Sequence, residues 1–157
     1  MAMKVLVSDP LAKEGVDILK SSKLKVDEVS KLSEAELCKK IKGYDAIIVR
    51  SGTTVTKKII EASDKLKVIG RAGVGLDNVD VKAASKKGIV VMNAPAGNTI
   101  STAEHAFSLM LSLSRNIPKA NESVKEGRWD RKKFMGVELY GKTLGIIGMG
   151  RIGTEFA

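Results

Sequence analysis

Residues 45–71, DAIIVRSGTTVTKKIIEASDKLKVIGR, contain two short apolar runs separated by a segment with a helical pattern. The runs at Asp45–Arg50 and Lys67–Arg71 are rich in Val and Ile, as is typical of strands buried on both faces of a sheet. Thr56 precedes the helical segment and is its expected N-cap. A strand, a helix and a second strand in this order predict a parallel pair joined by a crossover helix.

The same alternation extends over the first hundred residues. Further strands are predicted at Lys4–Ser8, Lys25–Val29 and Gly88–Met92, and further helices at Leu11–Lys20, Ser33–Ile41 and Val79–Lys87. The Ser33–Ile41 helix opens with Ser33 and Glu36 at the spacing of a capping box, and Gly88 is the expected stop after Lys87. Five strands alternating with four helices predict an α/β fold with a parallel, doubly wound sheet.

The pattern changes after Met92, where residues 93–98 (NAPAGN) form a turn-rich linker. Residues 101–104 (STAE) have capping-box spacing and predict the start of a helix that reaches about Arg115. Pro118 suits the first turn of a further helix that ends at Gly127. The expected domains are therefore residues 1–98 and residues 99–157.

The last residues combine a predicted strand, Lys142–Ile147, with the glycine pattern G-x-G-x-x-G at residues 148–153. In a dinucleotide-binding loop, Gly148 would permit the tight turn, Gly150 would let a pyrophosphate approach the backbone, and Gly153 would let helix and strand pack closely. A plain tight turn is the alternative. The acidic residue expected roughly 20 positions further on would lie beyond Ala157. Because one strand and one helical turn cannot bury a core, we expect the chain to be the front part of a longer protein or to pack against another chain.

Composition narrows the class of protein. The formal charge of +9 comes from 27 Lys and Arg against 18 Asp and Glu, and the basic excess is spread evenly along the chain. This spread and an aromatic content of 4% favour solvated lysines over a nucleic-acid groove. The single cysteine, Cys38, excludes an internal disulfide and a cysteine-cluster metal site. With neither an export signal nor a long apolar run in the sequence, we expect a cytoplasmic protein without membrane contact.

Polar residues follow three predicted strands at the ends where ligands bind to open α/β sheets. Arg50 and Arg71 each stand at a strand end, so their guanidinium groups could converge on one anion. The turn Gly73–Gly75 can expose backbone amides to a carboxylate or phosphate. The alternative for each arginine is a structural ion pair with Asp77 or Asp80.

Three further residues are weaker candidates. His105, the only histidine, lies in a predicted amphipathic helix and is expected to be structural or interfacial. Cys38 lies in a lysine-rich helix and is expected to be packed or half-exposed. The stretch Trp129–Phe134 (WDRKKF) could bind anions or form an arm that contacts a second subunit, and we favour the arm.

Three segments resemble the D-isomer-specific 2-hydroxyacid dehydrogenases. They are IIVRSGTTVT at residues 47–56, RAGVGLDN at 71–78 and NAPAGNTISTAEH at 93–105, and the stretch from RWDRKKF to GMGRIG continues the likeness. The resemblance implies a flavodoxin-like substrate domain in residues 1–98 and the start of a Rossmann nucleotide-binding domain in residues 99–157. It also implies NAD as the cofactor and a homodimer or larger homo-oligomer. Members that act on glyoxylate or hydroxypyruvate usually lack an arginine at the position of Arg71, so this residue favours a phosphorylated substrate.

The resemblance therefore implies oxidation of 3-phospho-D-glycerate to 3-phosphohydroxypyruvate, the first step of serine biosynthesis. It also implies roles for individual residues. The substrate residues would be Arg50, Ser51, Arg71, Gly73, Gly75 and Arg131, the last reaching the neighbouring subunit's substrate. The cofactor residues would be Val74 beside the nicotinamide and Gly148, Gly150, Arg151, Ile152 and Gly153 around the pyrophosphate.

The family's catalytic arginine, glutamate and histidine lie beyond the positions that these 157 residues match. His105 belongs to the AEH motif and cannot replace that histidine. We therefore expect the intact protein to be the enzyme and this chain alone to be inactive. The alternatives are a truncated binding or dimerisation module that keeps the anion site, another D-2-hydroxyacid dehydrogenase, and, less favoured, a basic nucleic-acid-binding domain.

Overall fold

The computed structural model describes residues 2–157, which divide into two compact units, residues 2–97 and Asn98–Ala157. Among residues 2–157, no helix is both long enough and apolar enough to cross a membrane.

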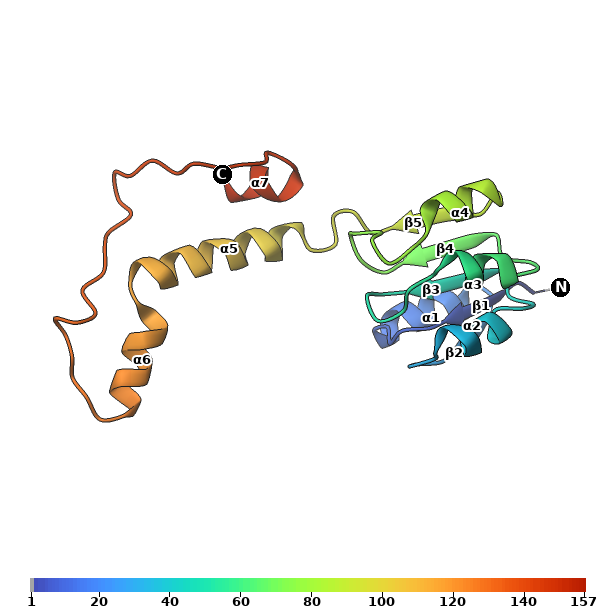
Figure 1. Ribbon diagram of the computed structural model, residues 1–157, viewed down its shortest axis with the longest axis horizontal. Coiled ribbons are helices and arrows are strands. Elements are labelled where there is room, and N and C mark those ends of the chain that lie inside the picture. The colour runs from blue at the N-terminus through green and yellow to red at the C-terminus, as the bar shows by residue number, and fades with distance from the viewer. Residues whose placement is uncertain (1) are drawn as a thin grey trace. The chain divides into compact units, whose positions relative to one another are not determined.

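The first unit is built on a parallel sheet, as predicted (Figure 1). Its strands are β1 (Lys4–Val7), β2 (Lys25–Glu28), β3 (Ala46–Val49), β4 (Val68–Arg71) and β5 (Val90–Asn93). Their order across the sheet is β2-β1-β3-β4-β5, and every neighbouring pair is parallel. This is the doubly wound, flavodoxin-like order, in which the strand sequence reverses between β1 and β3.

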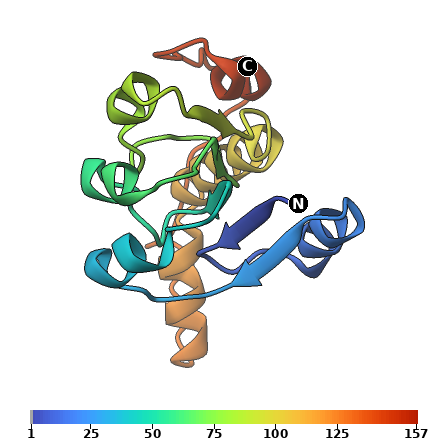
Figure 2. The ribbon, with the colours of Figure 1, turned by 90° about the vertical axis from the view of Figure 1, so that its right-hand side faces the viewer.

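Helices cover both faces of this sheet. They are α1 (Lys13–Ser21), α2 (Glu34–Lys40), α3 (Lys57–Ala62) and α4 (Val81–Lys86). Figure 2 shows α1 on one face and α2, α3 and α4 on the other. The connection from β1 to β2 and the connection from β2 to β3 run in opposite directions across the sheet, and because both are right-handed crossovers their helices lie on opposite faces. In folds of this type, ligands bind in the crevice at the β1–β3 border, where the strand order reverses.

The core lies between the sheet and the three helices on one face. Its fully buried side chains include Leu6, Ile47 and Ile69 from the strands and Leu37, Ile59 and Ile60 from the helices. Burial of these aliphatic side chains is the main favourable contribution to folding of the unit.

Local signals explain where the helices begin and end. Ser33 and Glu36 form the predicted capping box, and hydrogen bonds from the Ser33 hydroxyl and backbone lower the pKa of the Glu36 carboxyl. Thr56 caps α3 as predicted, and Gly88 has the positive φ of +72° that suits a helix stop. The cap of α4 is Asp80, which accepts from the Ala83 amide, so this helix begins later than the predicted Val79.

The second unit contains α5 (Thr99–Ser114), α6 (Ile117–Lys125) and α7 (Arg151–Phe156). The rings of Phe107 and Phe156 meet edge to face with their centroids 6.3 Å apart, so α7 packs along α5. The predicted capping box at residues 101–104 is wrong, because α5 already begins at Thr99. Ser101 therefore lies inside the first turn, where its hydroxyl donates to the Asn98 carbonyl.

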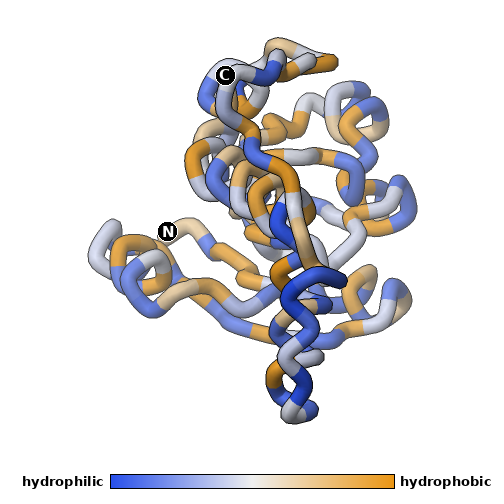
Figure 3. The backbone as a smooth tube through the Cα atoms, turned by 90° about the vertical axis from the view of Figure 1, so that its left-hand side faces the viewer, coloured by the Kyte–Doolittle hydropathy of each residue, from blue (hydrophilic) through white to orange (hydrophobic). Residues whose placement is uncertain are grey.

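The predicted strand at Lys142–Ile147 is also wrong. These residues are irregular, and Ile147 is fully exposed. Figure 3 shows hydrophobic positions recurring along this stretch, so the apolar pattern is present. Within residues 2–157 no strand pairs with it, and a strand without a neighbour leaves its backbone groups unpaired.

Candidate functional site

The carboxyl ends of the strands gather most of the predicted substrate residues at one edge of the first unit. Arg50 and Ser51 follow β3, and Arg71 ends β4 immediately before the turn that holds Gly73 and Gly75. The paired register of β3 and β4, with Val49 opposite Arg71, brings these two loops side by side. Arg50 and Ser51 are exposed, whereas the Arg71 side chain is only 12% exposed.

Asp9 holds the loop after β3, although it was not among the predicted site residues. It follows β1, is 8% exposed, and accepts hydrogen bonds from the backbone amides of Arg50 (2.6 Å) and Thr53 (3.0 Å). The Thr53 hydroxyl also donates to Asp9 Oδ1 at 2.9 Å. A side chain at Gly52 would place its Cβ 2.7 Å from the same oxygen, so glycine is needed for this close approach. Asp9 and the loop after β3 lie at the border where the strand order reverses.

Asn78 joins the loop after β3 to the turn after β4. Its Nδ2 donates to the carbonyls of Arg50 and Thr53, each at 2.6 Å, and its Oδ1 accepts from Arg71 Nε at 2.8 Å. The Asn78 carbonyl also accepts from the Val55 amide at 2.8 Å. Asn78 was not among the predicted site residues.

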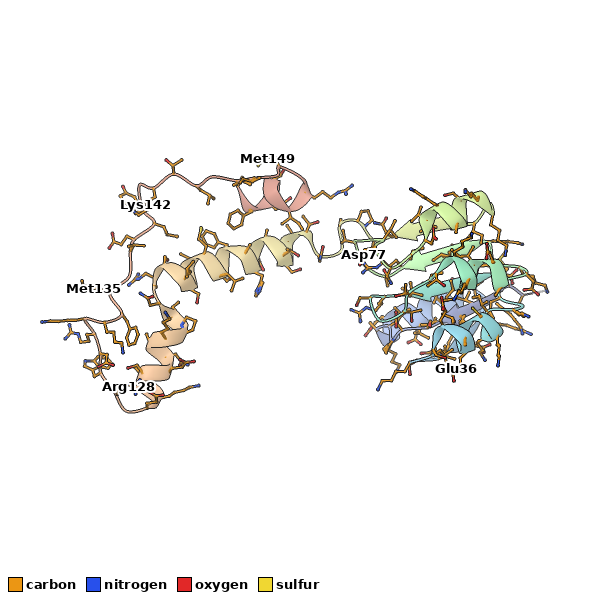
Figure 4. All side chains as sticks on the ribbon, viewed as in Figure 1. Glu36, Asp77, Arg128, Met135, Lys142 and Met149 are labelled. Carbon is orange, nitrogen blue, oxygen red and sulfur yellow. The ribbon has the colours of Figure 1, made fainter. Side chains whose placement is uncertain are left out.

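The guanidinium group of Arg71 lies against the glycine turn. A Cβ at Gly73 would collide with Arg71 Nη1, and a Cβ at Gly75 would lie 2.6 Å from Asp77 Oδ1. The ion pair foreseen as an alternative exists in a loose form, because Arg71 Nη2 lies 4.0 Å from Asp77 Oδ1 and the Asp77 side chain is 85% exposed. Figure 4 shows Asp77 at this edge of the sheet. Asp80, the other foreseen partner, is engaged as the cap of α4.

The loop after β5 supports the same turn. The side-chain amide of Asn93 donates to the Val74 carbonyl at 2.6 Å, and the Ala94 amide donates to the Gly73 carbonyl at 2.9 Å. The backbone conformation of the turn is thus determined by contacts on two sides, which is the preorganisation that an anion site requires.

An apolar hollow of about 480 Å³ adjoins this edge of the sheet, because Arg71, Asn93 and Ala94 are among its lining residues and Leu19 lines it from α1. Its lining is mainly aliphatic and includes Val5, Ile48, Val68 and Met92. The hydrogen-bond donors suited to an anion lie instead at the strand ends. We therefore place the candidate site at the strand ends.

The remaining candidates lie in the second unit, except Cys38. His105 and Arg131 are exposed, His105 on α5 and Arg131 in the irregular stretch after α6. Cys38 is half-buried against the core, as expected. Among the described residues, no cluster of His, Cys, Asp or Glu side chains could hold a metal ion.

Two glycines of the loop at residues 148–153 lie in backbone environments that favour glycine, although the strand predicted before the loop is absent. Gly148 has a φ of +101°, which favours glycine, and a Cβ at Gly153 would collide with the Gly148 carbonyl. Within residues 2–157 no atom lies within 4 Å of the place where a Cβ of Gly150 would stand. Gly150 is the N-cap of α7, so the backbone before Arg151 and Ile152 is open to a ligand.

Residues 5–153 match the family model described as D-isomer specific 2-hydroxyacid dehydrogenase, catalytic domain. The chain belongs to this family. Curated relatives named D-3-phosphoglycerate dehydrogenase are 56% identical in Archaeoglobus fulgidus, 56% in Synechocystis and 52% in Homo sapiens. These matches cover 98–99% of the chain but only 28–29% of each relative, so the chain spans less than a third of their length.

Solved structures with the same fold include proteins from other organisms. A protein from Thermus thermophilus aligns with a TM-score of 0.88 and 32% identity over 98% of this chain and 51% of its own. The NAD⁺-bound 3-phosphoglycerate dehydrogenase of Entamoeba histolytica aligns with a TM-score of 0.77 and 32% identity over 99% and 49%. Members of the family in this set include NAD complexes, so NAD is a cofactor of the family.

Proposed function

We propose that the full-length protein oxidises 3-phospho-D-glycerate to 3-phosphohydroxypyruvate with NAD, the first step of serine biosynthesis. The observation that carries the proposal is that the loop with Arg50 and the Gly73–Gly75 turn with Arg71 lie side by side at one edge of the sheet. The Arg50 guanidinium donates to the Pro10 carbonyl at 3.4 Å in this structure, so it would have to turn toward Arg71 to meet the same anion. Relatives named D-3-phosphoglycerate dehydrogenase, matched over almost all of this chain, support the same substrate. Residues 1–98 would then form most of a substrate domain, and residues 99–157 would begin the nucleotide domain.

The substrate carries a carboxylate and a phosphate, and the edge offers donors for both. Arg71 presents its Nη groups beside the glycine turn, and its exposed partner Asp77 is loosely held, so a substrate anion can take that place. The Gly75 amide would donate to the carboxylate, and the Gly73 amide would do so only by leaving the Arg71 carbonyl, to which it donates at 2.9 Å in this structure. Arg50 and Ser51, exposed on the adjacent loop, would supply a second positive charge and a hydroxyl donor.

The loop at residues 148–153 fits a dinucleotide. The positive φ of Gly148, the open space at Gly150 and the tight contact at Gly153 are the three features that a pyrophosphate-binding turn needs. Gly150, Arg151 and Ile152 would hold the pyrophosphate, and Val74 would border the nicotinamide. When bound, NAD supplies the hydride acceptor for the substrate's 2-hydroxyl carbon.

These 157 residues alone would not turn over. Hydride transfer requires an acid or base aligned with the substrate oxygen, and the only histidine, His105, is exposed on α5. The family's catalytic arginine, glutamate and histidine would come from sequence beyond the matched positions.

Exposed apolar side chains in the second unit support the proposal that the protein forms a homodimer or larger homo-oligomer. Several apolar side chains on α5 and after α6 are exposed, including Leu109 (57%), Leu113 (81%) and Trp129 (75%). Such surfaces mark interaction sites. Arg131 would then reach the substrate phosphate of the neighbouring subunit, and the mass of the full-length protein in solution tests this assembly.

Arg71→Ala in the full-length protein tests the proposed site. Loss of a buried, fork-shaped donor should raise KM for 3-phosphoglycerate by at least about thirtyfold while KM for NAD stays within about twofold. Lys82→Ala, which removes an exposed positive charge from α4 of the same unit, is the matched control and should leave both values unchanged. The 157-residue chain serves as the blank and should form no NADH. An unchanged KM in Arg71→Ala would remove Arg71 from the site, and NADH formation by the short chain would contradict its inactivity.

A further inference from the structure

We propose that Asn78 is a positioning residue that holds Arg71 and the Arg50–Thr53 loop in one anion-binding arrangement. This inference rests on the proposed function, because it assigns Asn78 a role toward the same substrate. Asn78 would not touch the substrate. It would act through the orientation of Arg71 and through the position of the loop that carries Arg50 and Ser51.

The contacts of Asn78 use its whole side-chain amide. Both Nδ2 hydrogens are engaged, one with the Arg50 carbonyl and one with the Thr53 carbonyl, and Oδ1 accepts from Arg71 Nε. The residue is 8% exposed, so these bonds are largely shielded from water. A buried amide with every donor used fixes the geometry of its partners, because moving any one of them leaves a polar group unpaired.

The bond to Nε decides which edge of the Arg71 guanidinium is available. With Nε held by Asn78, the edge formed by Nη1 and Nη2 lies against Gly73 and faces Asp77. Asp77 is exposed and 4.0 Å away, so its attraction is weak and screened by solvent. An arriving anion can therefore meet both Nη groups beside the turn.

The bonds to the two carbonyls act on the neighbouring loop. Asp9 accepts from the amides of Arg50 and Thr53, and Asn78 donates to the carbonyls of the same two residues. At both ends of the loop, the backbone amide is therefore bonded to Asp9 and the backbone carbonyl to Asn78. Removal of Asn78 leaves the Asp9 contacts in place, so we expect the loop to remain folded while its link to Arg71 is lost.

The test uses Asn78→Ala, Arg71→Ala and the double variant in the full-length protein. Asn78→Ala should raise KM for 3-phosphoglycerate about tenfold, with kcat and KM for NAD within about twofold of the wild type. Because Asn78 acts in part through Arg71, the double variant should raise KM by clearly less than the product of the two single effects, and a fully multiplicative effect would overturn the coupling. Asn121→Ala, an exposed asparagine on α6, is the matched control for the substitution.

The outcomes separate this inference from the proposed function. If Arg71→Ala leaves KM unchanged, the proposed site fails and the inference fails with it. If Arg71→Ala raises KM but Asn78→Ala does not, or if kcat and both KM values change together, only the positioning role is overturned.

A second variant covers the case in which Asn78→Ala does not fold. Arg71→Lys keeps the positive charge but has no Nε–H for Asn78 to hold. Its KM for 3-phosphoglycerate should approach that of Arg71→Ala. A wild-type KM in Arg71→Lys would show that charge alone suffices and would overturn the positioning role.

Discussion

Two stretches of the chain have nearly the same apolar character but different structures. Strand β3 (Ala46–Val49) lies between β1 and β4, and its Ile47 is 0% exposed. Residues 143–147 carry Ile147, which is 106% exposed, and they form no strand in the part of the chain that the structure describes. The difference teaches that an apolar run predicts a strand only where a second strand is available to pair with it.

The largest test of this comparison is a pair of identical substitutions. Ile47→Ala removes methyl and methylene groups from the centre of the core and should lower the free energy of unfolding by about 2–5 kcal/mol. Ile147→Ala removes the same groups from an exposed side chain and should change it by less than about 0.5 kcal/mol. Urea unfolding of the 157-residue chain, followed by circular dichroism, measures both.

Equal effects of the two substitutions would contradict the comparison. A large loss in Ile147→Ala would mean that residues 143–147 are packed in solution. In a longer form of the protein that supplies a neighbouring strand, we expect the cost of Ile147→Ala to rise toward that of Ile47→Ala.

The two tyrosines give a second test, based on pH. Burial and the hydrogen bond that the Tyr44 hydroxyl donates to Asp27 (2.6 Å) raise the pKa of Tyr44 to about 12. The folded state therefore binds this proton more tightly than the unfolded state, whose tyrosine pKa is about 10. The resulting stability is fully present below about pH 10 and is lost as the pH rises toward about 12.

Tyr44→Phe removes the ionisable group, so its stability should decline less between about pH 10 and 12 than that of the wild type. Tyr140→Phe, in the irregular stretch, is the control, because Tyr140 is 95% exposed. This control also leaves Tyr44 as the only tyrosine, and its ultraviolet absorbance should then titrate with a midpoint of about 12. An identical alkaline decline in Tyr44→Phe and wild type would contradict the assigned role of burial.

Much of the first unit could be predicted because its signals are local. Val- and Ile-rich runs, the capping box at Ser33 and the glycine stop at Gly88 each depend on residues within a few positions of one another. The parallel orientation of the strands followed from the alternation of strands and helices. The strand predicted at residues 142–147 is absent because strand pairing is not a local property, and no strand within residues 2–157 pairs with this stretch.

In the candidate site, too, some residues could be predicted from the sequence and others could not. Arg50, Ser51 and Arg71 could be placed at one edge because parallel strands end together. Asp9 and Asn78 could not be found by this rule, because their roles are hydrogen bonds to loops that are distant in sequence. Asp9 bonds to an amide 41 positions away, and Asn78 bonds to a carbonyl 28 positions away. The available signal for Asp9 was a carboxylate two residues after β1, the strand beside the reversal of strand order.

The smallest test compares two serines that have the same spacing to a glutamate. Ser33 caps α2, whereas Ser101 lies within the first turn of α5 and donates to the Asn98 carbonyl. Ser33→Ala leaves the Glu36 amide without its side-chain acceptor and should cost about 1 kcal/mol of unfolding free energy. Ser101→Ala removes no acceptor from a helix amide, and alanine favours a helix interior, so its effect should lie within about 0.5 kcal/mol of zero. Thermal and urea unfolding of both variants measure the difference. A cost at Ser101 equal to that at Ser33 would mean that the capping box predicted for residues 101–104 forms in solution, and that local signals govern the second unit as they do the first.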